Sequence, residues 1–244
     1  MSGGLVEELQ ARGCSWPAPV EHHDTLSSTS DRLKELARGG APAWTVVIAD
    51  EQTAGRGRQG RTWSSPRGGL YLSVLLRPAF ASAALLPLAA GVAVAEALGN
   101  FGVRAELKWP NDVLVEGRKE AGILAEASSS ASALEWVVLG IGVNLDGRAR
   151  PAAVAAAVLL RLTVWYDALE KREASVVAAW RERSVSWWGQ PVEVSAGERR
   201  LRGLAHGVDE RGALLLELED GAIVSVLAGE ARALRLLAGQ EIPE

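Results

Sequence analysis

The sequence has a single cysteine and no surplus of positive charge. Each of these features argues against a class of protein. Its single cysteine, Cys14, excludes an intramolecular disulfide framework and a cysteine-rich metal site. The formal net charge is −4, whereas a protein that binds nucleic acid through its general surface more often carries a broad basic face. With 48% hydrophobic and 23% charged residues, the chain of 244 residues has the composition of a folded globular protein.

The chain also lacks the patterns of a secretory signal and of a membrane span. The N-terminal stretch MSGGLVEELQARG contains glutamates but neither a basic start nor an apolar centre. The most apolar later runs, 83–98 and 151–165, are interrupted by Gly, Pro or Arg and fall short of a clean span of about 20 residues. We therefore expect a cytoplasmic protein without a membrane partner, and the single cysteine agrees with a reducing compartment.

Two buried strands and three further β-type segments are expected before residue 145. Apolar runs rich in β-branched residues predict strands at 44–50 and 69–78. The later segments read AELKWPND, VLVEGRKEAGILAE and LEWVVLGIGVNL, with a tight turn at Glu116–Gly117. Together these segments predict a mixed β-sheet.

Helical spacing predicts four helices that pack on this sheet. Apolar residues recur at helical spacing after the hydroxyl-rich stretch 28–31, so these hydroxyls are expected at a helix N-terminus. Another helix is expected over 84–98, and two more over 151–188 that end at residues 187–189. The predicted fold class is α+β, with a mixed sheet packed with helices.

From residue 189 onward the pattern changes and predicts a second, smaller domain. Five short strand-like runs follow one another: PVEVSA, RRLRGLAHGV, ALLLELE, AIVSVL and ARALRLL, the last over residues 231–237. Turn sequences such as AGE, DERG and EDG separate them. This density of short strands favours a small β-barrel over half of a sandwich. We place the boundary at 189–191, with one domain over residues 1–188 and the other over residues 189–244.

The stretch TAGRGRQGRTW, residues 53–63, combines glycines with arginines. Its Gly55-x-Gly57-x-x-Gly60 spacing is that of a dinucleotide-binding fingerprint, which requires a strand before it and a helix after it. Here the stretch leads into the predicted strand at 69–78, so we do not favour that interpretation. Glycine amides and arginine guanidinium groups both bind phosphate and carboxylate oxygens, so the loop is predicted to lie against an anion.

Three further motifs carry groups suited to an anion or a nucleotide. KWPND places Asn111 and Asp112 at a turn between strands. Lys119 emerges from a hairpin just before an apolar strand, where its ammonium could reach a carboxylate and a phosphate together. GIGVNL ends a buried strand with Asn144. Asp112 either orients Lys119 or Arg58 or caps its own turn.

Taken together, these motifs resemble the catalytic domain of the biotin protein ligases. The matching stretches are SSTS, ADEQTAGRGRQGRTWSSPRGGLYLSVLLRP, KWPNDVLVEGRKEAGILAE and GIGVNL. The tail, with GQPVEV and GVDERGALLLELEDG, resembles the C-terminal domain of that family. The resemblance covers about residues 20–237 and implies a class II synthetase-like catalytic domain followed by a small SH3-like β-barrel.

The resemblance implies an ATP-dependent biotin–protein ligase that works in two steps. The biotin carboxylate attacks the α-phosphate of ATP and gives biotinyl-5′-AMP and pyrophosphate. A lysine of the biotin carboxyl carrier protein of a carboxylase, such as acetyl-CoA carboxylase, then takes the biotin and releases AMP. Mg²⁺ is expected with the triphosphate, although the sequence does not indicate its ligands.

The resemblance also assigns residues of this sequence to the two substrates. The implied biotin contacts are Ser28, Thr29, Ser30, Gln52, Arg56, Gly57, Arg58, Lys119 and Gly122. The implied nucleotide contacts are Arg58, Arg61, Trp63, Asn111, Lys119 and Asn144. Lys119 would bridge the biotin carboxylate and the α-phosphate, and Arg58 would line the same groups. Lys119 and Arg58 are therefore the expected catalytic residues.

Three features depart from the family pattern. Ser30 stands where many relatives have asparagine, which shortens the reach to biotin, and Gln59 stands where a further arginine is common. Only about twenty residues precede the catalytic region, too few for the winged helix-turn-helix that makes some relatives repressors. A DNA partner is therefore not expected, and a homodimer is left open.

Two other classes of function are alternatives. A lipoate ligase or octanoyltransferase would share the fold, but GRGRQGR together with KWPND fits the biotin enzymes better. A nucleic-acid-binding module would use the arginines on backbone phosphates, but the acidic balance and the lack of an interleaved aromatic platform argue against it.

Overall fold

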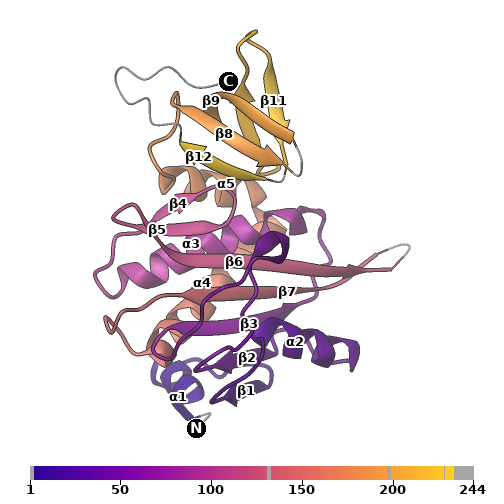
Figure 1. Ribbon diagram of the computed structural model, residues 1–244. Helices are drawn as coiled ribbons and strands as arrows, with labels where there is room; N and C mark the ends of the chain where they lie inside the picture. Colours follow the sequence, from indigo (N-terminus) through magenta and orange to yellow (C-terminus); the bar gives the residue numbers. More distant parts are fainter. Residues whose placement is uncertain (1–2, 131–132, 197–198, 228, 234–244) are drawn as a thin grey trace.

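The computed structural model describes residues 3–130, 133–196, 199–227 and 229–233, and Figure 1 shows two β-sheets that follow one another along the chain. The first is large and is covered by helices, and the second is small. This arrangement confirms the predicted α+β fold with a separate C-terminal β-module.

The large sheet has seven strands in the order β1-β2-β3-β7-β6-β5-β4. Their bounds are β1 (Val20–His23), β2 (Val46–Ala49), β3 (Leu70–Leu76), β4 (Glu106–Lys108), β5 (Asp112–Val115), β6 (Arg118–Ser129) and β7 (Leu134–Val143). β1 and β2 are parallel and the other neighbouring pairs are antiparallel, so the sheet is mixed as expected. The three β-type segments predicted after residue 100 form four strands, because the predicted turn at Glu116–Gly117 divides the second segment into β5 and β6.

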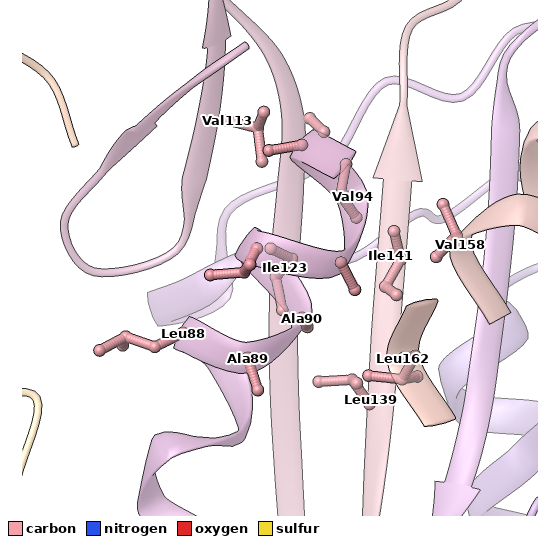
Figure 2. Packing of buried hydrophobic residues seen from close by; sticks show 14 of the residues in the cluster. Leu88, Ala89, Ala90, Val94, Val113, Ile123, Leu139, Ile141, Val158 and Leu162 are labelled. Carbon is pink, nitrogen blue, oxygen red and sulfur yellow. The ribbon is translucent and has the colours of Figure 1, made fainter. Parts of the chain in front are cut away.

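Helices cover both faces of the large sheet. They are α1 (Gly3–Ala11), α2 (Thr29–Arg38), α3 (Leu86–Gly99), α4 (Pro151–Lys171) and α5 (Glu173–Glu182), with short 3-10 turns η1 (Arg58–Gly60) and η2 (Ala81–Leu85). Leu139 and Ile141 of β7 pack with α3 and α4, as Figure 2 shows. Val138, which points to the opposite face, packs with Leu33 of α2. Alternate residues of one strand therefore bury against different helices, as the pleat of a strand requires.

Two helical segments are long and apolar enough to cross a membrane by length and composition, Ser82–Gly99 and Pro151–Lys171. In the fold, 67% and 56% of their most apolar windows is buried inside the protein. The apolar residues of α3 and α4 belong to the main hydrophobic core (Figure 2). The packing on the sheet therefore accounts for the hydrophobicity of both segments.

Two elements and one boundary differ from the sequence prediction. α1 and β1 were not predicted; β1 has the sequence VEHH, is half-buried throughout and is defined by its parallel pairing with β2. The last helix ends at Glu182 rather than at residues 187–189. It ends there because the chain turns to pair with β4: the Leu107 N–H donates to Arg183 O, and the Val185 N–H donates to Leu107 O.

The small sheet contains the five strands predicted after residue 189, in the order β11-β10-β9-β8-β12. They are β8 (Pro191–Ala196), β9 (Arg199–Val208), β10 (Leu214–Glu217), β11 (Ile223–Val226) and β12 (Glu230–Ala233). The end of the last predicted run, residues 234–237, lies outside the described residues. The Trp109 indole N–H fastens this sheet to the first by donating to Gly212 O at 2.9 Å.

Candidate active site

A cavity of about 430 Å³ lies between the N-terminus of α2, the arginine-rich loop and the strands β6 and β7. Every site residue predicted from the sequence lines it except Asn144. These lining residues are Ser28, Thr29, Ser30, Gln52, Arg56, Gly57, Arg58, Arg61, Trp63, Asn111, Lys119 and Gly122. Motifs far apart in the sequence therefore meet at one place in the fold.

The N-terminus of α2 supplies three buried hydroxyl groups to one end of the cavity. Ser28 caps the helix, since its Oγ accepts a hydrogen bond from the Asp31 N–H at 3.3 Å. Thr29 and Ser30 form the first turn, as the hydroxyl-rich stretch predicted. The N–H and the Oγ1 of Thr29 both donate to Gln52 Oε1, at 2.9 and 3.1 Å. These hydroxyl side chains are polar and carry no charge.

Lys119 is held by a carboxylate and an aromatic ring. Its Nζ lies 2.7 Å from Asp112 Oδ1 and 5.3 Å from the centroid of the Trp63 ring. This contact agrees with one of the roles considered for Asp112, the orientation of Lys119. The Lys119 side chain is 43% exposed, so its ammonium stays accessible to a ligand in the cavity.

Arg58 links the arginine loop to the rest of the cavity wall. Its Nη1 donates to Asn111 Oδ1 at 2.9 Å and to Gly229 O at 3.1 Å. Asn111 is fixed in turn, because its Nδ2 donates to Ile123 O at 2.6 Å. Gly229 lies between β11 and β12, so the small sheet contributes backbone to the cavity and to the position of Arg58.

Arg56, from the same loop, faces carboxylates on α2 and β6. Its guanidinium lies 2.8 Å from Asp31 Oδ1 and 3.2 Å from Glu126 Oε1. The Lys34 Nζ joins the same two carboxylates, at 2.6 and 3.1 Å. Partial burial of Asp31 opposes its ionisation, but the Lys34 and Arg56 cations outweigh that effect and hold the pKa of its carboxyl below the usual value. Arg56 therefore has less positive charge to offer a ligand than its sequence position implies.

Two glycines provide the space for the Trp63 indole. Gly122 and Gly142 are direct partners across β6 and β7. A Cβ on Gly122 would lie 3.0 Å from Trp63 Cζ3, and a Cβ on Gly142 would collide with the indole Nε1. This Nε1 is buried and has no hydrogen-bond partner among the described residues. A hydrogen-bond acceptor on a ligand would satisfy it.

Asn144 is the one predicted site residue that the fold places elsewhere. It borders a separate small cavity behind β6, together with Glu120 and Arg148. Its backbone N–H donates to Glu120 O at 2.8 Å, and the Glu120 carboxylate pairs with Arg148. A role for Asn144 towards the nucleotide stays a prediction.

Several residues of the cavity or its support were not predicted as site residues. Ser73 is fully buried in β3 beneath Thr29, and its signal was a lone hydroxyl in the apolar run LYLSVLL. Lys108 lines the cavity with its Nζ 5.4 Å from the Trp187 ring centroid. Trp187 and Gly229 line the cavity as well. The last two carry no local sequence signal, because only the fold brings them to this place.

Comparison with known proteins agrees with this geometry. The chain matches the Biotin/lipoate A/B protein ligase family over residues 23–144 and the Biotin protein ligase C terminal domain over residues 188–231. The Biotin–[acetyl-CoA-carboxylase] ligase of Paracoccus denitrificans is 35% identical over 220 residues, which cover 79% of this chain and 91% of that protein. The Bifunctional ligase/repressor BirA of Bacillus subtilis is 32% identical over 227 residues, which cover 82% of this chain and 70% of that protein.

A solved structure shows the same relationship in three dimensions. The biotin protein ligase from Aquifex aeolicus in complex with biotin and ATP has a TM-score of 0.75 and is 31% identical, covering 88% of this chain and 97% of that one. The first family match contains the arginine loop, KWPND and Lys119, and the second contains most of the small sheet. The chain therefore belongs to the biotin/lipoate A/B protein ligase family and, within it, to the biotin protein ligases, which are ATP-dependent enzymes.

Proposed function

We propose that this cavity joins biotin to AMP and then passes the biotin to a lysine of a biotin carboxyl carrier protein. One observation carries the proposal: an uncharged hydroxyl end and a cationic end, formed by Arg58 and the Asp112-bound Lys119, line the same cavity. Biotin has the same division, because its ureido ring is neutral and its side chain ends in a carboxylate. The cationic end is then the place where this carboxylate meets the α-phosphate of ATP.

In the first step a carboxylate oxygen of biotin attacks the α-phosphorus, and the bond from that phosphorus to the leaving pyrophosphate breaks. Two anions must approach each other, so the enzyme's contribution is to position them and to stabilise the developing charge. Lys119 provides a compact positive charge for both groups, and Asp112 keeps its ammonium in place. Arg58 provides a planar fork of donors for the phosphate oxygens.

In the second step the lysine amine of the carrier attacks the carbonyl carbon of the mixed anhydride. An amide bond forms, the carbonyl carbon separates from the phosphate oxygen, and AMP leaves. A mixed anhydride also reacts with water, so the enzyme must shield it until the carrier arrives. The arginine loop, residues 53–67, forms one wall of the cavity and is the segment placed to do this.

Mg²⁺ fits this site as a companion of ATP. Among the described residues, no group of three or more His, Cys, Asp or Glu side chains could hold a metal ion. The cavity carboxylate Asp112 is engaged by Lys119. Mg²⁺ is usually held by one or two carboxylates with substrate phosphates and waters. An ion carried by the triphosphate, which spreads its charge, suits these residues better than a resident one.

The carrier protein, the compartment and the assembly state are proposals of the same kind. A carboxylase carrier domain is the proposed partner because its lysine must reach the adenylate. We propose the cytoplasm as the compartment because ATP is a substrate there. A homodimer and the absence of a DNA partner stay predictions.

Biotin-dependent exchange of labelled pyrophosphate into ATP tests the first step. We expect exchange that requires biotin, ATP and Mg²⁺, because adenylation is reversible while pyrophosphate is present. Lipoate serves as the matched control, since it also ends in a carboxylate but lacks the ureido ring. Exchange driven by lipoate as strongly as by biotin would favour the lipoate ligases of the same family. Oligonucleotide binding that weakens steeply with salt would favour a nucleic-acid-binding role instead.

The loop over residues 53–67 is expected to be mobile without ligand and to become ordered with biotin plus ATP. The backbone bonds within it include one from the Gly57 N–H to Arg61 O at 2.8 Å and one from the Trp63 N–H to Gly55 O at 2.9 Å. Most of its residues are exposed, and bonds of this kind open at low free energy.

Amide hydrogen exchange across the loop, measured with and without biotin plus ATP, checks this expectation. The loop amides should gain protection on binding, while the amides of the buried strand β7 serve as the internal control. A loop that is already protected in the free enzyme, or equally unprotected in the complex, would contradict the expected ordering of the loop on ligand binding.

A further inference from the structure

We propose that Ser73 is a positioning residue that sets the direction of the hydroxyl groups in the cavity, so that Thr29 and Ser30 present only hydrogen-bond acceptors to the ligand. The inference rests on the proposed function, because it concerns how the same site selects its carboxylic acid. Ser73 lies in β3 opposite Gly140 of β7, fully buried behind the hydroxyl end of the cavity. It therefore acts through Thr29 and Ser30.

The chain of hydrogen bonds begins at Gln52, whose amide orientation is fixed. The Thr29 N–H is a donor only, and it lies 2.9 Å from Gln52 Oε1. That atom must be the amide oxygen, which turns Nε2 towards Ser65 Oγ at 2.9 Å. The Ser65 hydroxyl accepts this bond and donates a hydrogen bond to Trp63 O at 3.1 Å. Each end of the Gln52 amide therefore has one consistent partner.

From Gln52 the direction of each later bond follows. The Thr29 hydroxyl donates its proton to Gln52 Oε1 at 3.1 Å. Ser73 Oγ lies 2.9 Å from Thr29 Oγ1 and must supply the proton of that contact, because the Thr29 proton is already used. The Ser73 proton is then used as well, so in the 3.0 Å contact between Ser30 and Ser73 the donor is Ser30.

The result is a cavity end with a defined polarity. The hydroxyl protons of Thr29 and Ser30 are already engaged in hydrogen bonds to Gln52 and Ser73. Both oxygens therefore offer only lone pairs to a ligand. Ser28 differs, because its Oγ accepts from the Asp31 N–H and thereby keeps its proton for a ligand. A cyclic urea is complementary to this set, since it has one carbonyl acceptor and N–H donors. A dithiolane ring has no N–H donor, so the arrangement discriminates against lipoate.

Gly140 leaves the space that this arrangement needs. A Cβ at Gly140 would lie 2.7 Å from Ser30 Oγ and 3.6 Å from Ser73 Oγ. The Ser30 side chain ends in a hydroxyl, which rotates freely and can either donate or accept. The acceptor character of position 30 is therefore supplied by Ser73 rather than by the side chain alone.

The experiment compares biotin with its two cyclic carbamate analogues, in which a ring oxygen replaces one or the other ureido N–H. The ring oxygen is similar in size to the N–H group that it replaces. It carries a lone pair instead of a proton, so it faces the acceptor on the protein with a second acceptor. In the wild-type protein we expect at least one analogue to bind about tenfold or more weakly than biotin, because a hydrogen bond is lost and two acceptors meet. Equal binding of biotin and both carbamates by the wild-type protein would overturn the proposal without any variant.

The Ser73→Ala variant tests the role of Ser73 itself. Without Ser73 the Ser30 hydroxyl can turn and donate to the ring oxygen of one carbamate. The carbamate penalty, which is the factor by which that analogue binds more weakly than biotin, should therefore shrink severalfold. The KM for biotin should rise about tenfold, with kcat for pyrophosphate exchange at saturating biotin changed by less than about twofold. Thr45→Val is the matched control: it also removes a buried hydroxyl, one that donates to Pro42 O outside the cavity. Its carbamate penalty should equal that of the wild type.

Two results for Ser73→Ala would contradict the proposal. One is an unchanged KM for biotin, and the other is a carbamate penalty as large as in the wild type. Failure of the proposed function has a different signature, because the wild-type protein would then show no biotin-dependent pyrophosphate exchange at all.

Discussion

Replacing Lys119 by alanine is expected to lower the rate of biotin-dependent pyrophosphate exchange by about two to three orders of magnitude while the protein stays folded. In the proposed first step, the charge of this ammonium lies where the biotin carboxylate and the α-phosphate approach each other. Removing one group that stabilises such a transition state typically costs about that factor. Each 1.4 kcal/mol lost from that stabilisation slows the reaction about tenfold. Initial exchange rates at saturating biotin and ATP measure the effect.

Stability should change little, because the Lys119 side chain is 43% exposed and its ion pair with Asp112 is partly solvated. Arg118→Ala is the matched control, since it removes a positive charge from the adjacent exposed position of β6, outside the cavity lining. Lys119→Arg keeps the charge but not the compact ammonium, so it should restore only part of the activity. A folded Lys119→Ala enzyme with normal turnover would remove Lys119 from the chemistry.

The sequence predicts a residue correctly where its conformation depends only on the neighbouring residues in the chain. The hydroxyls at 28–30 precede a helical pattern, and the helix does begin there with Ser28 as its cap. The arginine loop leads into an apolar run, and it does join β2 to β3. In both cases the local chain alone decides the conformation. The resemblance to biotin protein ligases added a prediction of which ligand each motif binds.

Residues whose role depends on distant partners could not be predicted. Ser73 reads as an ordinary member of a buried strand until Thr29 and Ser30 are placed over it. Gly229 reaches Arg58 only because the small sheet packs beside the turn that carries Asn111. Arg56 looked like a free cation in the sequence, but α2 and β6 bring Asp31 and Glu126 to it. Tertiary contacts of this kind leave no periodic pattern in the chain.

The contrast between Arg56 and Arg58 leads to the second large effect. Arg58 bonds to two neutral acceptors, Asn111 Oδ1 and Gly229 O. Both hold the guanidinium in position beside the cavity. Arg56 lies between two carboxylates, which already compensate part of its charge. The carboxylates around Arg56 should therefore weaken its attraction for an anionic phosphate.

Arg58→Ala is expected to speed the release of biotinyl-5′-AMP by about tenfold to a hundredfold while weakening the binding of biotin alone much less. The phosphate exists only in the adenylate, and hydrogen bonds to a charged group contribute about 1.5–3 kcal/mol each. Dissociation of preformed adenylate, followed beside the Kd for biotin, measures both effects. Arg56→Ala should show the same pattern with a smaller change, because its charge is already paired.

Arg67→Ala is the control: it removes an arginine from the same loop, but one whose guanidinium faces Asp50 and Glu51 outside the cavity. Equal losses of biotin and adenylate in Arg58→Ala would mean that Arg58 holds the biotin carboxylate rather than the phosphate, and the second step would then depend on Lys119 alone to retain the activated intermediate.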